Sequence, residues 1–254
     1  MARSILIPEL PRFVSPMLAK RGAPFDSPDH LFEVKWDGTR VLAFVDTNRY
    51  RMVNRHRADV TERYPELGFL NDLPAGIVLD GEVVVLRQGK PDFGLLLSRN
   101  QARASLKIQS LARTFPATYV VFDLVYHRFE SLLVLPLWVR RQRLEKAVWV
   151  CANSKLVFSE GIVGPGRAFF EAVCREGLEG VVAKRLDGRS LRRIGHRRST
   201  RCAGTPSRAT GRAVGQRGRK QRQRVGRSPR GAGMAKKRPQ LDANGNYGFV
   251  CHLG

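Results

Sequence analysis

Residues 33–40 read EVKWDGTR, and this stretch decides both the fold and the candidate site. Lys35 ends a short apolar run, 31–35, and the Asp-Gly pair that follows Trp36 predicts a turn. A lysine at the end of a strand can act as a nucleophile when desolvation or a nearby cation lowers the pKa of its amine. Taken alone, a lysine before an Asp-Gly turn is more often a solvated strand end, so the rest of the chain must decide.

Short runs rich in Val, Leu and Phe recur on both sides of this stretch and are bounded by Gly, Asp or Pro, which is typical of strands. They cover residues 31–35, 40–45, 76–86, 117–126, 155–160 and 179–185. Thr61 is expected to cap a short helix. Because strands occur both in succession and in alternation with helices, the sequence predicts an α+β fold with a mostly antiparallel sheet.

Two longer helical patterns lie among these strands. Residues 135–148 place apolar side chains at helical spacing and predict a basic outer face, with Trp138 and Trp149 expected to pack against neighbours. Residues 167–177 place apolar side chains on one face and stop at Gly177, a residue type that commonly follows a helix.

Charged residues interrupt three of the apolar strands. Asp80 and Glu82 flank a glycine in one, Asp123 lies in the second, and the third begins at Glu179 and ends near Lys184. Each residue alone is more often the polar, water-facing residue of an exposed strand. Together with the lysine, however, charges that are costly to bury without a partner indicate one polar site built on a sheet.

The chain has 254 residues and a formal net charge of +23, and the charge is unevenly distributed. Residues 189–254 hold 18 basic side chains and one acidic one, with few large apolar residues. Such a segment buries too little apolar surface to offset its ordering entropy, so we expect a disordered tail. It is either a basic arm for nucleic acid or the product of GC-rich DNA read out of frame.

Several classes of protein are excluded by composition. No apolar run reaches the length of about 18 residues that a membrane span needs, and the N-terminus lacks the apolar stretch of a signal peptide. The four cysteines are far apart and form no zinc-binding pair. We therefore expect a cytoplasmic protein with reduced thiols and no membrane partner.

An ordered set of motifs resembles the nucleotidyltransferase domain of ATP-dependent DNA ligases. The set comprises K-x-D-G at 35–38, D-G-E at 80–82, F-D-x-x-Y at 122–126 and E-G-V-V-x-K at 179–184. Two further segments fit this family, S-P-M-L-A at 15–19 and N-R-H-R-A-D-V-T at 54–61 with Y-P-E-L after it, although Arg57 replaces a glycine of the pattern. The resemblance runs from about residue 12 to 188 and implies an ATP-grasp-like adenylation domain over residues 1–188.

The resemblance implies a chemistry and a set of roles. Lys35 would attack the α-phosphate of ATP, and the AMP would then pass to a 5′-phosphate in nicked double-stranded DNA before the nick is sealed. The resemblance implies that Glu82 and Glu179 bind Mg²⁺ or the ribose and phosphate, and that Lys184 contacts the α-phosphate. It implies that Phe122 stacks on the adenine and that Glu33 reads the adenine edge. Arg40 and Arg55 would contact the ribose, the phosphates or the DNA. The chain is expected to act as a monomer.

The pattern fails beyond residue 188. The family has a K-x-K pair downstream of its E-G-V-V-x-K lysine, whereas residues 197–204 read RRSTRCAG, and the segment 189–254 shows no strand pattern of an OB-fold barrel. We therefore expect 189–254 to be a truncation or frameshift product and nick sealing to be weak. The alternatives are a non-catalytic basic nucleic-acid-binding protein, or another K-x-D-G nucleotidyltransferase such as an RNA ligase or capping enzyme; the segments 15–19 and 64–67 favour a DNA ligase.

Overall fold

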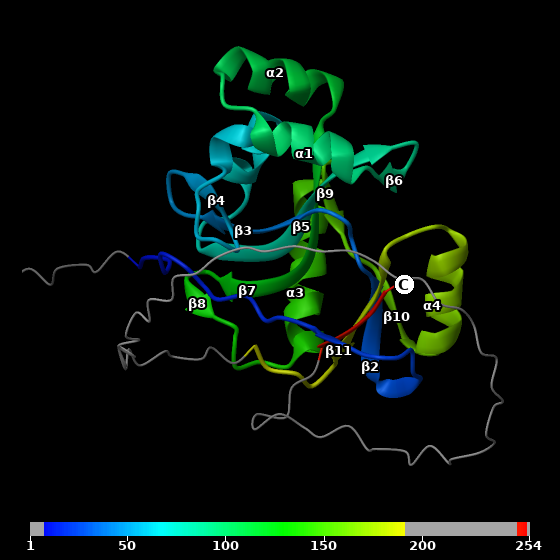
Figure 1. The fold of residues 1–254 in the computed structure, drawn as a ribbon. Helices are drawn as coiled ribbons and strands as arrows, with labels where there is room; N and C mark the ends of the chain where they lie inside the picture. The colour runs from blue at the N-terminus through cyan, green and yellow to red at the C-terminus, as the bar shows by residue number, and fades with distance from the viewer. Residues whose placement is uncertain (1–7, 191–247, 253–254) are drawn as a thin grey trace, which may run out of the picture. The chain divides into compact units, whose positions relative to one another are not determined.

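The computed structural model of the chain describes residues 8–190 and 248–252, which build two β-sheets (Figure 1). The larger sheet has the order β4 (Tyr50–Asn54), β3 (Thr39–Val45), β5 (Ile77–Arg87), β7 (Ala117–His127) and β8 (Glu130–Ser131), with β6 (Lys90–Pro91) paired to β5 and β9 (Leu156–Phe158) paired to β7. The smaller sheet has the order β1 (Lys20–Arg21), β12 (Gly248–His252), β11 (Gly180–Arg185), β2 (Ser27–Val34) and β10 (Gly161–Gly164).

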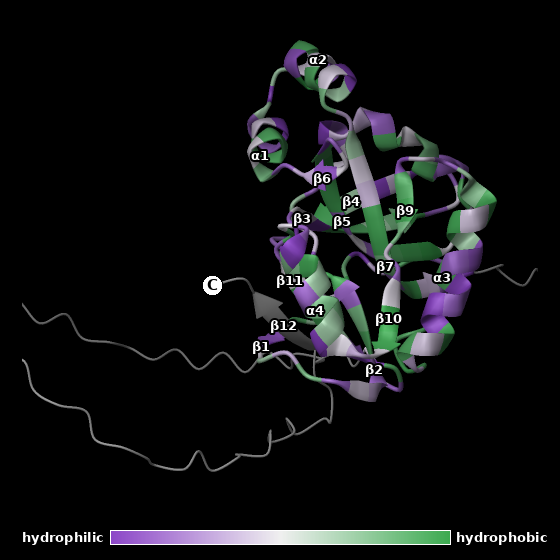
Figure 2. Ribbon diagram, turned by 90° about the vertical axis from the view of Figure 1, so that its right-hand side faces the viewer, coloured by the Kyte–Doolittle hydropathy of each residue, from purple (hydrophilic) through white to green (hydrophobic). Residues whose placement is uncertain are grey.

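The pairing is mostly antiparallel, which confirms the predicted α+β class. Only β7 with β9 and β1 with β12 run parallel among the described strands. All six strands expected from the sequence are present, as β2, β3, β5, β7, β9 and β11. Figure 2 shows β5, β7 and β9 largely in the colours of hydrophobic residues, as their Val and Leu content leads one to expect.

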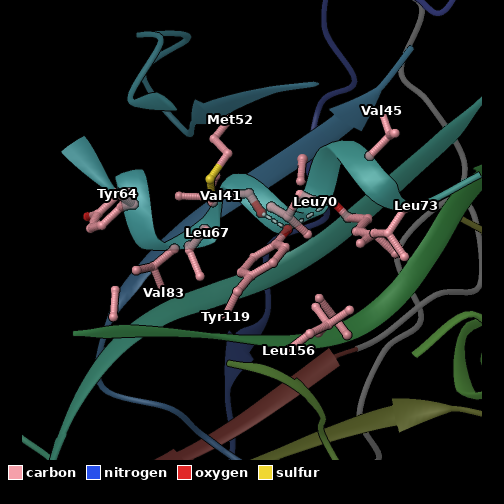
Figure 3. Packing of buried hydrophobic residues seen from close by; sticks show 14 of the residues in the cluster. Val41, Val45, Met52, Tyr64, Leu67, Leu70, Leu73, Val83, Tyr119 and Leu156 are labelled. Atoms are coloured by element: carbon pink, nitrogen blue, oxygen red, sulfur yellow. Dashed lines mark hydrogen bonds between the residues drawn. The ribbon is translucent and has the colours of Figure 1, made fainter. Parts of the chain in front are cut away.

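The main hydrophobic core covers one face of the larger sheet. Leu67 and Leu70, from the 3₁₀-helix η2 (Pro65–Asp72), are fully buried against strand residues such as Met52 (Figure 3). Tyr119 is also fully buried there, and its single O–H is shared between the carbonyl oxygens of Val41 (2.8 Å) and Leu79 (3.1 Å). This satisfied tyrosine ties three neighbouring strands together beneath the site.

Helices flank the two sheets. They are η1 (Thr61–Arg63), α1 (Phe93–Gln101), α2 (Ser105–Thr114), α3 (Leu137–Cys151) and α4 (Gly166–Arg175). The helix α4 fits the sequence prediction, since Val173 lies in the core of the smaller sheet and Gly177 follows the helix with a φ of +68°. The helices α1 and α2 are not predicted from the sequence, because their short apolar patterns are interrupted by polar residues.

Two details of the helices differ from expectation. Thr61 does not cap a helix; it lies inside η1, and its backbone N–H donates to Asp59 Oδ1 at 2.9 Å. On α3, Arg143 and Lys146 are exposed as expected, but Arg140 and Arg141 are buried. Trp138 and Trp149, expected to pack against neighbours, are 49% and 79% exposed.

The expected tail lies mostly outside the described residues. Within it, Gly248–His252 forms β12, which pairs antiparallel with β11, so this short segment differs from the expected absence of regular structure. Among the helices that the structure describes, none has the length and apolar character needed to cross a membrane.

Candidate active site

A cavity of about 800 Å³ lies where the two sheets face each other, and both sheets line it. Every candidate site residue chosen from the sequence lies on its wall: Glu33, Lys35, Arg40, Arg55, Glu82, Phe122, Glu179 and Lys184. The fold therefore brings together motifs that are separated by up to about 150 positions of sequence.

Lys35 lies at the end of β2, where the chain leaves the smaller sheet. Its backbone N–H donates to the carbonyl oxygen of Gly180 at 2.8 Å, and its Nζ forms an ion pair with Glu179. Burial lowers the pKa of the Lys35 amine, although the nearby carboxylates of Glu82 and Asp37 oppose that shift. A partly desolvated amine of this kind is a better nucleophile than a surface lysine.

The turn after Lys35 requires its glycine. A Cβ atom on Gly38 would clash with the carbonyl oxygen of Val83 and with the side chain of Glu82. The close approach of the turn to β5 is what places Lys35 and Glu82 on the same cavity.

Two carboxylates of β5 line the cavity and differ in whether a cation pairs with them. Asp80 accepts two hydrogen bonds from Arg40, at 2.9 and 2.7 Å, so its charge is balanced. The carboxylate of Glu82 forms no hydrogen bond or ion pair among the described residues, and burial, reinforced by Asp80, raises its pKa to about 8 against the opposing effect of Arg40. A buried carboxylate of this kind is costly to ionise without a cation beside it.

Glu33 is almost completely buried, with an exposed fraction of 1%. One of its carboxylate oxygens pairs with Arg141 and the other with Lys184. Burial lowers the pKa of the Lys184 amine, whereas the adjacent Glu33 raises it in part. Glu33 thus lies at the centre of a charged network at the base of the cavity.

Phe122 offers an aromatic face to the cavity. The Nζ atom of Lys184 lies 4.1 Å from the centroid of its ring, and the guanidinium carbon of Arg40 lies 5.3 Å from it. Cations over an aromatic face are favourable, and the same face can stack on a planar base. Arg55 lies at another part of the wall, where its Nε is 3.1 Å from His56 Nε2.

The N-terminal segment also reaches this cavity. Arg40 donates a hydrogen bond of 2.6 Å to the carbonyl oxygen of Met17, and residues 16–19 line the wall. The S-P-M-L-A segment is therefore part of the site.

Two arginines of α3 support the site and were missed in the sequence analysis. Arg140 forms a two-point ion pair with Asp123, at 2.7 and 2.8 Å, and Arg141 pairs with Glu33. Hydropathy assigns an arginine to the surface. The available signal was the pair of acids, Glu33 and Asp123, which could not be buried in strands without cations.

The described residues contain no group of three or more His, Cys, Asp or Glu side chains that could hold a metal ion. Glu82 and Glu179 are two carboxylates on one cavity wall, with Lys35 interacting with both. Two carboxylates suit Mg²⁺, which keeps several waters and takes its remaining oxygens from phosphates. These residues therefore fit Mg²⁺ brought in with a nucleotide, and not an ion enclosed by protein ligands.

The fold and these site residues define a nucleotidyltransferase domain. Lys35 and Glu179 adjoin strands of the smaller sheet, Glu82 lies in the larger one, and all three line the same cavity. The family model of the ATP dependent DNA ligase domain matches residues 16–199, and the chain belongs to that family.

Known relatives agree with this assignment. The SPbeta prophage-derived DNA ligase-like protein LigB of Bacillus subtilis is 34% identical over 177 residues, which cover 69% of this chain and 62% of that protein. The multifunctional non-homologous end joining protein LigD of Pseudomonas aeruginosa is 33% identical over 183 residues, covering 70% of this chain and 20% of that protein. The chain therefore spans less than two thirds of the length of these relatives.

Solved structures show the same fold. A mycobacterial DNA ligase D complexed with ATP and MES has a TM-score of 0.58 and 33% identity, covering 70% of this chain and 56% of that one. The ligase domain of LigD from M. tuberculosis has a TM-score of 0.57 and 34% identity, covering 70% and 55%.

Proposed function

We propose that the cavity binds ATP, that Lys35 becomes covalently adenylated, and that the AMP is then passed to the 5′-phosphate of nicked double-stranded DNA for sealing. The observation that carries this proposal is the position of Lys35, a partly buried amine that pairs with Glu179 and feels the charge of Glu82, in a cavity lined by every candidate site residue. The ATP in the mycobacterial DNA ligase D structure supports the choice of nucleotide.

The first step needs a neutral amine. Lys35 Nζ loses a proton and forms a bond to the α-phosphorus of ATP, while the bond from that phosphorus to the bridging oxygen breaks and pyrophosphate leaves. Burial lowers the pKa of Lys35, and the carboxylate of Glu179 in contact with Nζ is the group placed to accept the proton. Positioning and charge stabilisation account for most of the catalysis of phosphoryl transfer.

The remaining wall residues supply that positioning. In this proposal Phe122 stacks on the adenine, Glu33 contacts the adenine edge and Lys184 contacts the α-phosphate; the contacts of Phe122 and Glu33 with Lys184 on one cavity wall support these roles. Arg40 and Arg55 are available for the ribose, the phosphates or the DNA backbone. Mg²⁺ held in part by Glu82 and Glu179 would neutralise phosphate charge when bound.

The name of the Pseudomonas relative, which refers to non-homologous end joining, supports a role in DNA repair for this chain. We further propose that it acts as a monomer in the cytoplasm. Because residues 197–204 read RRSTRCAG where the family has K-x-K, we expect adenylation with inefficient sealing.

The decisive experiment is incubation of the purified full chain with α-labelled ATP and magnesium, followed by a denaturing gel. Label should remain on the unsubstituted chain and on Lys107→Ala, which changes an exposed lysine of α2, and should be absent from Lys35→Ala. Parallel reactions with labelled GTP and NAD test the capping-enzyme and NAD-dependent chemistries, and a nicked duplex measures sealing separately.

Label that persists in Lys35→Ala, or its absence from the unsubstituted chain, would overturn the proposal. Labelling by GTP in preference to ATP would point to a capping enzyme. DNA binding that falls steeply with salt, without any labelling, would favour the non-catalytic nucleic-acid-binding alternative.

A further inference from the structure

We infer that Arg141, a buried residue of α3 for which the motifs predict no role, positions the nucleotide pocket by serving as the permanent counterion of Glu33. The inference rests on the proposed function, in that the ligand is taken to be ATP.

Arg141 contacts three parts of the cavity wall at once. Its Nη1 pairs with Glu33 on β2 and lies 3.2 Å from the carbonyl oxygen of Phe122 on β7. Its Nη2 donates to the carbonyl oxygen of Ser159 at 2.6 Å. The hydroxyl of Ser159 in turn accepts a hydrogen bond from the indole of Trp36, at 3.2 Å, in the turn that follows Lys35.

Arg141 itself does not line the cavity, although Glu33, Phe122, Ser159 and Trp36 all do. The guanidinium lies behind the wall, with its carbon 4.4 Å from the centroid of the Phe158 ring. Any effect of Arg141 on a nucleotide must therefore pass through the residues that it holds, which makes it a positioning residue.

The charge balance around Glu33 shows why this matters. The Glu33 carboxylate is shared between Arg141 and Lys184. If Lys184 turns to the α-phosphate when ATP binds, Glu33 loses one of its two cations while it stays buried. An unpaired buried carboxylate is strongly destabilising, so Arg141 must remain for Lys184 to be released.

The contacts of Arg141 also require an arginine. Its planar fork donates to a carboxylate and two carbonyl oxygens in fixed directions, which the single ammonium of a lysine cannot reproduce. Arg141→Lys therefore keeps the charge and removes the geometry.

The chain offers a matched control in Arg99. This arginine of α1 is also buried and also pairs with a glutamate, Glu66, at 2.6 and 2.9 Å, but neither residue lines the cavity. Arg99→Lys makes the same chemical change in a structural ion pair. Both substitutions should lower the melting temperature.

The test is equilibrium titration of ATP and of GTP into the full chain carrying Lys35→Ala, which prevents covalent transfer. We expect Arg141→Lys to weaken ATP binding about tenfold relative to Arg99→Lys and to reduce the preference for ATP over GTP. ATP affinities within about twofold of each other in the two variants would overturn the inference.

A double-mutant cycle separates action through Glu33 from general loosening. In a Glu33→Gln background no buried carboxylate needs a counterion, so the added effect of Arg141→Lys on ATP binding should largely vanish. An unchanged effect in that background would overturn the inference. ATP binding without labelling of Lys35 in the unsubstituted chain would refute only the proposed adenylation, whereas absence of ATP binding would refute both.

Discussion

The two faces of the strand β5 differ in the side chains that they carry: one is apolar and packs in the core, and the other is charged and lines the cavity. On one face, Leu79, Val83 and Val85 are buried in the main hydrophobic core beneath η2 and against Tyr119. On the other face, Asp80 and Glu82 line the cavity, and the positive charge of Arg40 acts on both carboxylates. Strand alternation alone separates these sets, because successive side chains point to opposite sides of a sheet.

The stability of the fold and the chemistry of the site therefore depend on different interactions. The core face gains stability from burial of apolar area, whereas the cavity face buries charges, of which Asp80 is paired with Arg40 and the carboxylate of Glu82 has no partner among the described residues. Figure 3 shows the first kind of packing, in which Tyr119 and Leu70 fill the space between η2 and the sheet. Changes on the two faces should therefore be distinguishable by measurement.

The largest expected effect on stability comes from the core face. Leu79→Ala removes a side chain that is 1% exposed and should lower the free energy of unfolding by about 2–5 kcal/mol, measured by urea denaturation. Below its melting temperature this variant should still label Lys35 with AMP.

Asp80, the neighbour of Leu79 on the cavity face, should affect labelling more than stability. Asp80→Asn keeps the size of the side chain but removes the charge that Arg40 contacts, and Arg40 keeps access to solvent through its partly exposed side chain. We expect a smaller loss of stability than for Leu79→Ala and a larger loss of labelling rate. Equal losses of labelling in both variants, assayed well below their melting temperatures, would show that the faces are not separable.

The sequence predicts much of this arrangement. Six runs of Val, Leu and Phe identified β2, β3, β5, β7, β9 and β11 but not the remaining strands, and every candidate site residue chosen from the sequence lines one cavity. The motifs succeed because a site on strands requires charged residues within apolar runs, and those departures are visible in the sequence.

The parts that could not be predicted are those in which burial contradicts residue type. Arg141 and Arg99 are buried because distant glutamates, Glu33 and Glu66, balance them, and the sequence does not show which acid meets which base. Trp149 is exposed although hydropathy places it inside. Pairing across 108 and 33 positions is a property of the tertiary fold and not of local pattern.

The protonation of Glu82 should make the contribution of the cavity face to stability depend on pH, unlike that of the core face. Burial raises its pKa to about 8, so between about pH 4.3, its unfolded value, and pH 8 the folded chain holds a proton that the unfolded chain releases. The associated stability is complete at the acidic end and is lost as the pH rises through about 8. In Glu82→Gln the melting temperature should therefore fall less between pH 5 and 9 than in the parent.

Magnesium should act through the same residue. A cation beside Glu82 favours its carboxylate, so Mg²⁺ added in the presence of ATP at pH 7 should raise the melting temperature of the parent and release protons, with a smaller effect on Glu82→Gln. Glu62→Gln, which changes an exposed glutamate of η1, should behave like the parent in both measurements. Identical pH profiles for the parent and Glu82→Gln would contradict the assignment of an unpaired carboxylate to the cavity face.

The smallest effect is expected for the aromatic surface of the cavity. Phe122→Leu keeps an apolar side chain but removes the face over which Lys184 and Arg40 lie, so ATP binding should weaken by about 1 kcal/mol, the lower end of base–aromatic stacking energies. Phe93 on α1 also lines the cavity but is 44% exposed, and no cation lies over its ring among the described residues. Phe93→Leu should therefore leave ATP affinity unchanged in the same titration, because Phe93 is half exposed at the edge of the cavity, whereas the ring of Phe122 packs against both Lys184 and Arg40.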